Sequence, residues 1–228
     1  EISGAKGEDK YLPHLLGHEG SGIVEQLGPG VTKFEVGDRI VLHWKVGNGI
    51  QSDTPIYKWR NKTLNAGWVT TFNSYAIVSE NRCTKVSKNT EPYLASLLGC
   101  AITTGFGVIE NNAKLKMGES IVIFGAGGIG LSIIQGAVSV SASKIIAVDI
   151  HENRLKLAKR IGATHIICST KEDPFKSIER IVGSKKLDVF IDNTGIPKVI
   201  ENGYSLIKND GRLILVGVPK KGENINIF

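Results

Sequence analysis

The segment IVIFGAGGIG, residues 121–130, decides the fold of this chain. An apolar run typical of a buried strand leads into the spacing G-x-G-x-x-G, and an apolar helical pattern follows at once. In this arrangement Gly125 permits a tight turn, Gly127 lets a pyrophosphate approach the backbone, and Gly130 lets the helix pack on the strand. Free N–H groups at a helix start favour phosphates, so the segment predicts a dinucleotide-binding strand–turn–helix unit.

An acidic residue stands at the expected interval after this glycine loop. Asp149 closes the next apolar run, KIIAVDI, residues 144–150. A carboxylate there would accept hydrogen bonds from both adenosine ribose hydroxyls and would repel the extra phosphate of NADP, which favours NAD. Arg154 could reach the same ribose and could also tolerate a 2′-phosphate. The alternative, in which the glycines only pack a helix on a strand, has less support because strand, helix and Asp149 all occur where the motif needs them.

The second half of the chain alternates apolar, β-branched runs with helical patterns. Strands are predicted over residues 121–127, 144–150, 165–169, 187–193 and 212–218, with helices over 128–140, 152–163, 173–183 and 197–208. Such alternation indicates right-handed βαβ units and a parallel sheet that is buried on both faces. We therefore expect the α/β class, with a Rossmann-type doubly wound parallel sheet.

The first half has a different pattern, with short strand-like runs separated by turn signals. SGIVEQLG (21–28), VGDRIVLHW (36–44) and FNSYAIVS (72–79) predict a compact, mostly antiparallel β domain. Residues 45–68 show no periodicity, and we expect them to form a long ordered loop. In LLGHEGSGIV (15–24), His18 lies among three glycines, which suggests close backbone approach either to a metal or cofactor or to packed neighbours.

Composition limits the classes of protein to consider. The chain has 228 residues, 41% hydrophobic and 22% charged, which favours two modest domains. Its net charge of +6 comes from dispersed lysines, without the basic block of a nucleic-acid arm. We find no apolar stretch of membrane-spanning length and no signal-peptide pattern, so we expect a cytoplasmic protein without nucleic-acid or membrane partners. Three scattered cysteines, Cys83, Cys100 and Cys168, argue against a disulfide framework.

These elements together resemble the zinc-containing alcohol dehydrogenases of the medium-chain dehydrogenase/reductase superfamily. The resemblance covers nearly the whole chain and keeps the family's order and spacing. The matching stretches are GHEGSGIVEQLGPGVTKFEVGDRIV (17–41), LLGCAITTGFG (97–107), IVIFGAGGIGLS (121–132), AVDI (147–150) and RLILVGV (212–218). It implies a partial GroES-like catalytic domain over residues 1–100 and a partial NAD-binding Rossmann domain over residues 101–228.

The resemblance also implies roles for individual residues. His18 and Cys100 would be two ligands of a catalytic zinc, Glu19 would be a carboxylate beside the metal, and Trp44 would line the substrate pocket. A Cys₂His zinc site with an open fourth position suits the polarisation of an alcohol oxygen. The implied cofactor contacts are Thr104, Gly125, Gly127, Gly128, Ile129, Gly130, Asp149, Arg154, Val216 and Val218.

Three departures from the family pattern qualify this expectation. The family's other cysteine ligand would fall before Glu1, and a further strand with a return to the catalytic domain would follow Phe228. Residues 45–68 contain none of the four cysteines that bind a structural zinc in many relatives. We therefore expect one catalytic zinc, no structural zinc, and an incomplete chain that is inactive alone.

The leading hypothesis is an NAD-dependent, zinc-dependent alcohol or polyol dehydrogenase, a homodimer or homotetramer when full length. A zinc-free NADPH quinone or enone reductase is one alternative, and His18, Cys100 and Asp149 argue against it. A dinucleotide-binding protein without catalysis is another, because a fold alone does not establish chemistry.

Overall fold

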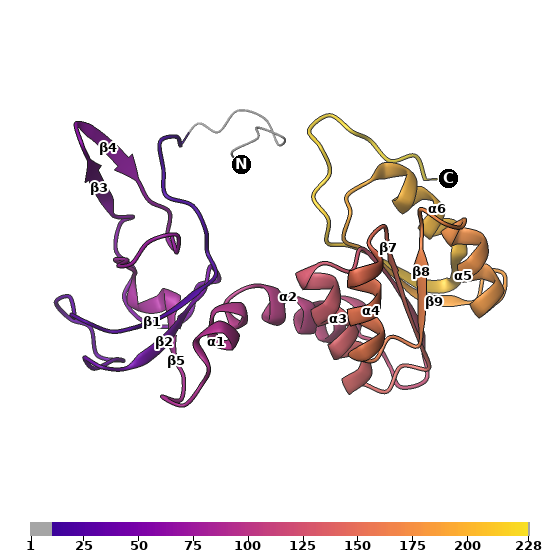
Figure 1. Ribbon diagram of the computed structural model, residues 1–228, viewed down its shortest axis with the longest axis horizontal. Helices are drawn as coiled ribbons and strands as arrows, with labels where there is room; N and C mark the ends of the chain where they lie inside the picture. Colours follow the sequence, from indigo (N-terminus) through magenta and orange to yellow (C-terminus); the bar gives the residue numbers. More distant parts are fainter. Residues whose placement is uncertain (1–10, 228) are drawn as a thin grey trace. The chain divides into compact units, whose positions relative to one another are not determined.

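The computed structural model describes residues 11–227. These divide into two compact units, the first ending at Thr103 and the second beginning at Thr104 (Figure 1). The helix α2 (Ala101–Gly107) contains this division and continues into a π-helical turn, η2 (Val108–Ala113).

The second unit is built on a sheet of five parallel strands. The strands are β6 (Ser120–Phe124), β7 (Lys144–Asp149), β8 (His165–Cys168), β9 (Leu187–Asp192) and β10 (Ile207–Leu215). Every predicted run in this half contains a strand, so the prediction of a parallel sheet is confirmed. The spatial order is β10-β9-β6-β7-β8, and the direction of winding therefore reverses between β6 and β9.

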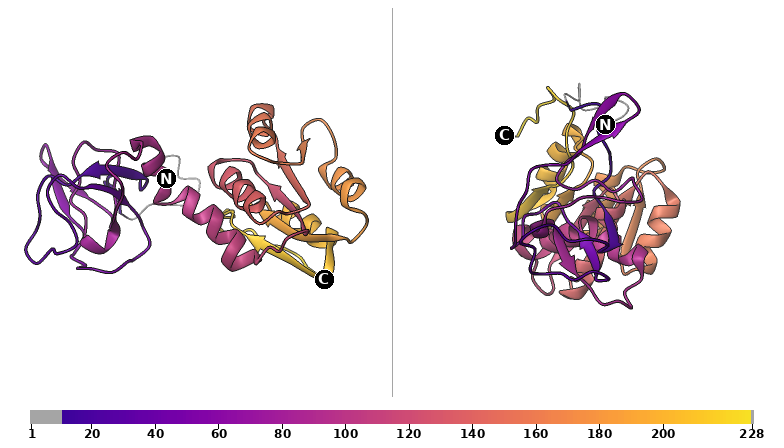
Figure 2. Two further views of the ribbon diagram at one scale, coloured as in Figure 1. Left: turned by 90° about the horizontal axis from the view of Figure 1, so that it is seen from below. Right: turned by 90° about the vertical axis from the view of Figure 1, so that its left-hand side faces the viewer.

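Helices cover both faces of this sheet (Figure 2). They are α3 (Gly128–Ser139), α4 (Glu152–Arg160), α5 (Pro174–Val182) and α6 (Pro197–Leu206). Alternate residues of β6 point to opposite faces, as the strand period requires. Ile121 and Ile123 pack in one apolar core with residues of α3 and α4, whereas Val122 and Phe124 pack in the other with residues of α5 and α6. The fold is thus doubly wound, as predicted.

The first unit contains a small antiparallel sheet in the order β1-β2-β5. Its strands are β1 (Gly20–Ile23), β2 (Arg39–Leu42) and β5 (Cys83–Lys85), and the short helices η1 (Glu80–Arg82) and α1 (Pro92–Leu98) flank β5 in sequence. Its core is a compact apolar cluster of Phe34, Ile40, Leu42, Val69 and Cys83. The burial of Cys83 raises the pKa of its thiol to about 11, so it behaves as a core residue.

The strand predicted over residues 72–79 does not form, and that prediction is wrong. The backbone N–H groups of this segment find other acceptors: Phe72 donates to the Leu16 carbonyl at 3.1 Å, and Ile77 donates to the Tyr57 hydroxyl at 3.0 Å. Phe72, Tyr75 and Ile77 are exposed. The aromatic and β-branched composition that suggested a strand therefore does not correspond to a half-buried sheet surface here.

Residues 45–68 also differ from the expected loop without secondary structure. They contain a hairpin of β3 (Ile56–Trp59) and β4 (Lys62–Asn65), in which Trp59 pairs with Lys62 across a two-residue turn. Arg60 in that turn has φ of 55°, in the left-handed region. The strand-favouring residues of IYKW and KTLN account for the pairing.

Within residues 11–227, no single helix is long and apolar enough to cross a bilayer, although the bent pair Pro92–Leu98 and Ala101–Ala113 passes that test by length and composition only.

A cluster of charged and polar side chains joins the amino-terminal ends of β6, β9 and β10. Asp188 in β9 accepts hydrogen bonds from the N–H and hydroxyl of Ser120, both at 2.7 Å, and pairs with Lys208 of β10 at 2.8 Å. Burial raises the pKa of Asp188, but the hydrogen bonds from Lys208 and Ser120 outweigh burial and hold this pKa below its ordinary 3.8. The ionised carboxylate therefore stabilises the fold.

We predict that Asp188→Asn lowers the thermal midpoint by about 2–4 °C at pH 7. A lowered pKa means that the stabilisation is present above the unfolded value and is lost as the carboxylate protonates. The gap between the unsubstituted protein and the variant should therefore shrink as pH falls through 3.8 and below. Circular dichroism melts from pH 7 to pH 3 measure this gap, and a gap independent of pH would contradict the ion-pair account.

Candidate functional site

The carboxyl ends of β6 and β9 lie side by side where the winding of the sheet reverses. The chain leaves β6 at Gly125 toward α3 and leaves β9 at Asn193 toward α6, which covers the opposite face. The Asn193 N–H donates to the Phe124 carbonyl at 2.9 Å, so the parallel pairing continues to the point where the two chains separate. Open α/β sheets bind ligands in the crevice at such a reversal.

The glycines of the loop after β6 differ in what surrounds them. Gly125 has φ of +99°, which a residue with a side chain rarely adopts. A Cβ added to Gly130 would lie 2.0 Å from the Gly125 carbonyl oxygen, so only glycine fits there. A Cβ added to Gly127 or Gly128 would meet no described atom within 4 Å. The loop is therefore closely packed at Gly125 and Gly130 and open at Gly127 and Gly128.

The helix α3 begins directly on this loop, at Gly128 with Gly127 as its N-cap. Gly127 has no side chain that could accept a hydrogen bond from the first turn. The first N–H groups of any helix lack partners within the helix, and together with the helix dipole they attract an anion. Ile129 is the second residue of this turn and is half-buried against the core.

Asp149 links the end of β7 to the glycine loop. Its carboxylate is almost fully buried, with one oxygen accepting from the Ala126 N–H and the other from the His151 N–H, both at 2.8 Å. Arg154 approaches one oxygen at 3.6 Å. A carboxylate has about four acceptor positions, and the two backbone hydrogen bonds use about two of them, so the others are open to Arg154 or to hydroxyls of a ribose. These residues fit the adenosine ribose of a dinucleotide.

Asp192 fixes the loop that follows β9, and the sequence interpretation missed it. This fully buried carboxylate accepts from the Thr194 N–H at 3.0 Å and hydroxyl at 2.6 Å, and from the Gly195 N–H at 2.8 Å. Its signal was present in the sequence, because Asp192 ends the apolar run LDVFID just as Asp149 ends KIIAVD.

A hollow of about 450 Å³ opens beside this loop. It is lined by Thr194, Gly195, Ile196, Pro197, Val218, Pro219, Lys220 and Glu223. Val218 thus faces the hollow, whereas Val216 packs against the core and donates its N–H to the Asp192 carbonyl at 2.8 Å. The two valines expected at the cofactor therefore have different surroundings.

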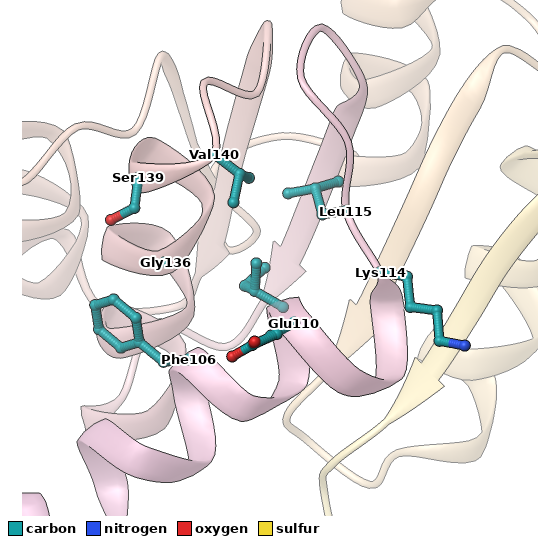
Figure 3. Close-up of a pocket in the computed structure, with 8 residues that line it drawn as sticks. Phe106, Glu110, Lys114, Leu115, Gly136, Ser139 and Val140 are labelled. Atoms are coloured by element: carbon teal, nitrogen blue, oxygen red, sulfur yellow. The ribbon is translucent and has the colours of Figure 1, made fainter.

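A second hollow of about 440 Å³ lies at the other end of α3 (Figure 3). Gly136, Ser139 and Val140 border it on one side, and Phe106, Ile109, Glu110, Lys114 and Leu115 border it on the other. From Gly128 to Gly136 a helix rises about 12 Å. This hollow is therefore separate from the crevice at the glycine loop.

The residues expected at a metal lie in the first unit. His18 is exposed in the segment before β1, and Cys100 is half-buried in the turn after α1. Glu19 accepts a hydrogen bond from the Ala101 N–H at 2.9 Å, which brings the segment of His18 beside the residue that follows Cys100. Thr104, expected at the nicotinamide, is half-buried in α2 and belongs to the second unit.

These residues do not form a complete zinc site. Within residues 11–227, no three side chains of His, Cys, Asp or Glu are grouped so that they could hold a metal ion. A catalytic zinc normally has three protein ligands. The described residues therefore do not fit a zinc ion by themselves.

Two of the glycines around His18 are explained by packing. A Cβ on Gly17, where φ is +81°, would lie 2.6 Å from the Phe72 ring, and one on Gly20 would lie 2.7 Å from the Thr71 side chain. A Cβ on Gly22 would meet nothing within 4 Å. Gly17 and Gly20 thus make room for the chain at Thr71 and Phe72.

Trp44, expected in the substrate pocket, is half-exposed and firmly placed. Its indole lies over Gly67, where an added Cβ would be 3.4 Å from the ring. The buried Arg82 donates to the Trp44 carbonyl, donates to the Gln51 amide at 3.2 Å, and lies 5.3 Å from the centroid of the Trp68 ring. Arg82 was missed because these contacts join residues far apart in the sequence.

Glu80 also stabilises the region around Trp44 and Arg82. Its buried carboxylate accepts from the N–H groups of Ile50, Thr32 and Lys33, each at 2.8 Å, and these hydrogen bonds hold the pKa of Glu80 below its ordinary value. Together, Glu80 and Arg82 position the segment that begins with Trp44.

Comparisons with known proteins match both halves of the chain to one family. The family model described as zinc-binding dehydrogenase matches residues 128–228, and the model described as alcohol dehydrogenase GroES-like domain matches residues 2–88. An S-(hydroxymethyl)glutathione dehydrogenase of Komagataella pastoris is 33% identical, with 99% of this chain matched to 67% of that relative.

Solved structures of similar fold include two bacterial proteins. Benzyl alcohol dehydrogenase from Acinetobacter calcoaceticus matches with a TM-score of 0.83 and 35% identity, and an alcohol dehydrogenase zinc-binding domain protein from Burkholderia ambifaria matches with a TM-score of 0.86 and 33% identity. Each match covers 95% of this chain and 65% of the other. The chain thus spans about two thirds of the length of these relatives.

We predict that two alanine substitutions in the glycine loop change the free energy of unfolding by different amounts. Gly130→Ala places a methyl group on the Gly125 carbonyl and should cost about 1–3 kcal/mol or more, as overpacking does. In Gly127→Ala the new methyl group meets no described atom within 4 Å, and the φ of −75° suits any residue. This substitution should therefore change the free energy of unfolding by less than about 1 kcal/mol. Urea unfolding measures both, and equal losses would contradict the geometry.

Proposed function

This chain belongs to the zinc-containing alcohol dehydrogenase family, and we propose that the full-length protein transfers hydride between an alcohol or carbonyl substrate and NAD. The observation that carries the choice of cofactor is Asp149, a buried carboxylate with unused acceptor positions beside an open glycine loop. The alcohol chemistry rests on the relatives, whose printed names include benzyl alcohol and S-(hydroxymethyl)glutathione dehydrogenases.

In this proposal the second unit binds and orients the dinucleotide. The N–H groups of Gly128 and Ile129 face the pyrophosphate, and Gly127 lets it approach the backbone. Asp149 accepts from the adenosine ribose hydroxyls, and Arg154 lies against the same sugar. When bound, NAD supplies the nicotinamide ring that accepts a hydride from the alcohol carbon.

In the same proposal, the first unit contributes zinc ligands and part of the substrate pocket. We propose that His18 and Cys100 are two zinc ligands in the full-length protein, with Glu19 beside them through its bond to Ala101. Trp44 forms a wall of the substrate pocket. The described residues do not complete a zinc site by themselves, so a further ligand would have to come from outside residues 11–227.

We predict that Asp149→Ala weakens NAD binding by at least about tenfold, the usual effect of losing hydrogen bonds to a charged group. NADP binding should weaken less, because the same change removes a repulsive charge near the 2′-phosphate. Calorimetric titration of the full-length protein with both cofactors measures the ratio. Asp210→Ala, at an exposed acidic residue, is the control. An unchanged preference for NAD over NADP would refute the ribose role.

We predict that His18→Ala and Cys100→Ala each abolish turnover of simple alcohols and lower the zinc content of the full-length protein. NAD should still bind, because neither residue belongs to the second unit. Elemental analysis and calorimetry measure zinc and NAD separately, and Cys168→Ser is the control for loss of a half-buried thiol. Full zinc content in either alanine variant would overturn the ligand assignment. A zinc-free unsubstituted protein that prefers NADP would support a quinone or enone reductase instead.

A further inference from the structure

Asn193 lies where the chains leaving β6 and β9 separate, beside the glycine loop, and the proposed function gives it no role. It directly follows β9, and its Cβ would lie 3.2 Å from a Cβ added to Gly125. Its side-chain Nδ2 donates to the Gly125 carbonyl at 3.3 Å. The amide is thus held against the first glycine of the loop.

The oxygen of this amide has no hydrogen-bond partner among the described residues. Asn193 Oδ1 is buried, and no atom within residues 11–227 donates a hydrogen bond to it. Rotating the amide would place its oxygen against the Gly125 carbonyl oxygen, so the bond from Nδ2 fixes the orientation. Buried acceptors are nearly always satisfied, so an unpaired acceptor beside the glycine loop calls for a donor.

We propose that Asn193 Oδ1 accepts a hydrogen bond from a hydroxyl of the nicotinamide-side ribose of NAD. This inference rests on the proposed function. An acceptor needs a donor, which excludes the pyrophosphate oxygens and leaves the ribose hydroxyls, the adenine amine and the nicotinamide carboxamide.

The strand order selects among these donors. Asp149 at the end of β7 takes the adenosine ribose, and β7 lies on one side of β6 while β9 lies on the other. A dinucleotide with its pyrophosphate at the loop after β6 therefore directs its nicotinamide half toward Asn193. The ribose is the part of that half adjacent to the pyrophosphate, as Asn193 is adjacent to Gly125. The hollow that begins at Thr194 provides space beyond it.

A purely structural role for Asn193 makes a different prediction. If the amide acts only through Nδ2 on Gly125, its removal disturbs the glycine loop and weakens every ligand that has a pyrophosphate. If Oδ1 contacts the second ribose, only ligands that contain this ribose are weakened. ADP lacks the second ribose, ADP-ribose has it without the nicotinamide, and NAD has both.

Calorimetric titration of the full-length protein with these three compounds tests the proposal. Asn193→Leu, of similar shape, should weaken NAD and ADP-ribose by about five- to tenfold, as expected for one hydrogen bond, and leave ADP unchanged. Asn193→Ala should give the same pattern and serves if the leucine variant does not fold. The matched control is Asn81→Leu in the first unit, because Asn81 is also buried with an unpartnered Oδ1 among the described residues. It should change none of the three affinities.

Several results would overturn the assignment. An equal loss for ADP would place the effect in the glycine loop, a loss for NAD alone would assign the bond to the carboxamide, and no change would mean that Oδ1 binds only water. In all three cases the unsubstituted protein still binds NAD, so the proposed function survives. If the unsubstituted protein binds none of the compounds, both the function and this inference fail.

Discussion

The contact between Gly130 and the Gly125 carbonyl oxygen is the constraint on which the proposed dinucleotide site depends. No side chain fits between them, since even a Cβ would lie 2.0 Å from that oxygen. Because α3 packs this closely, it can begin only three residues after Gly125 and still lie against the sheet. Its first N–H groups are thereby placed at the carboxyl edge of β6. The two buried aspartates that end β7 and β9 accept backbone hydrogen bonds from the adjoining loops: Asp149 from the glycine loop and from the loop after β7, and Asp192 from the loop after β9.

The two units differ in how much of their structure could be predicted from local sequence patterns. The central strands β6, β7 and β9 are almost wholly buried, so each appears as a near-continuous apolar run and was predictable together with the helices between the strands. The edge strands β8 and β10 are less buried, and β10 begins at Ile207, five residues before the predicted run, because its first half (IKNDG) carries no apolar pattern. Asp149 was predictable because the glycine spacing fixes where to look. Asp192 ends an apolar run in the same way two strands later, and Asn193 directly follows it, but no motif points to either residue. Their significance appears only when β9 is seen beside β6.

The first unit is less predictable because its contacts are distant in sequence and often run from side chain to backbone. Residues 72–79 have strand-like composition, yet their N–H groups bond to Leu16 and Tyr57. Arg82 and Glu80 hold the segment after Trp44 through contacts that no local pattern signals. For the metal, the structure joins Glu19 to Ala101, but the ligand roles of His18 and Cys100 stay proposals.

A crystal structure of the full-length protein with NAD tests the central claim most directly. The account predicts the pyrophosphate against the backbone at Gly127 and Gly128, the adenosine ribose on Asp149, and the nicotinamide half on the β9 side of β6. A dinucleotide bound elsewhere, or bound in the reverse direction with its adenosine at β9, would contradict it.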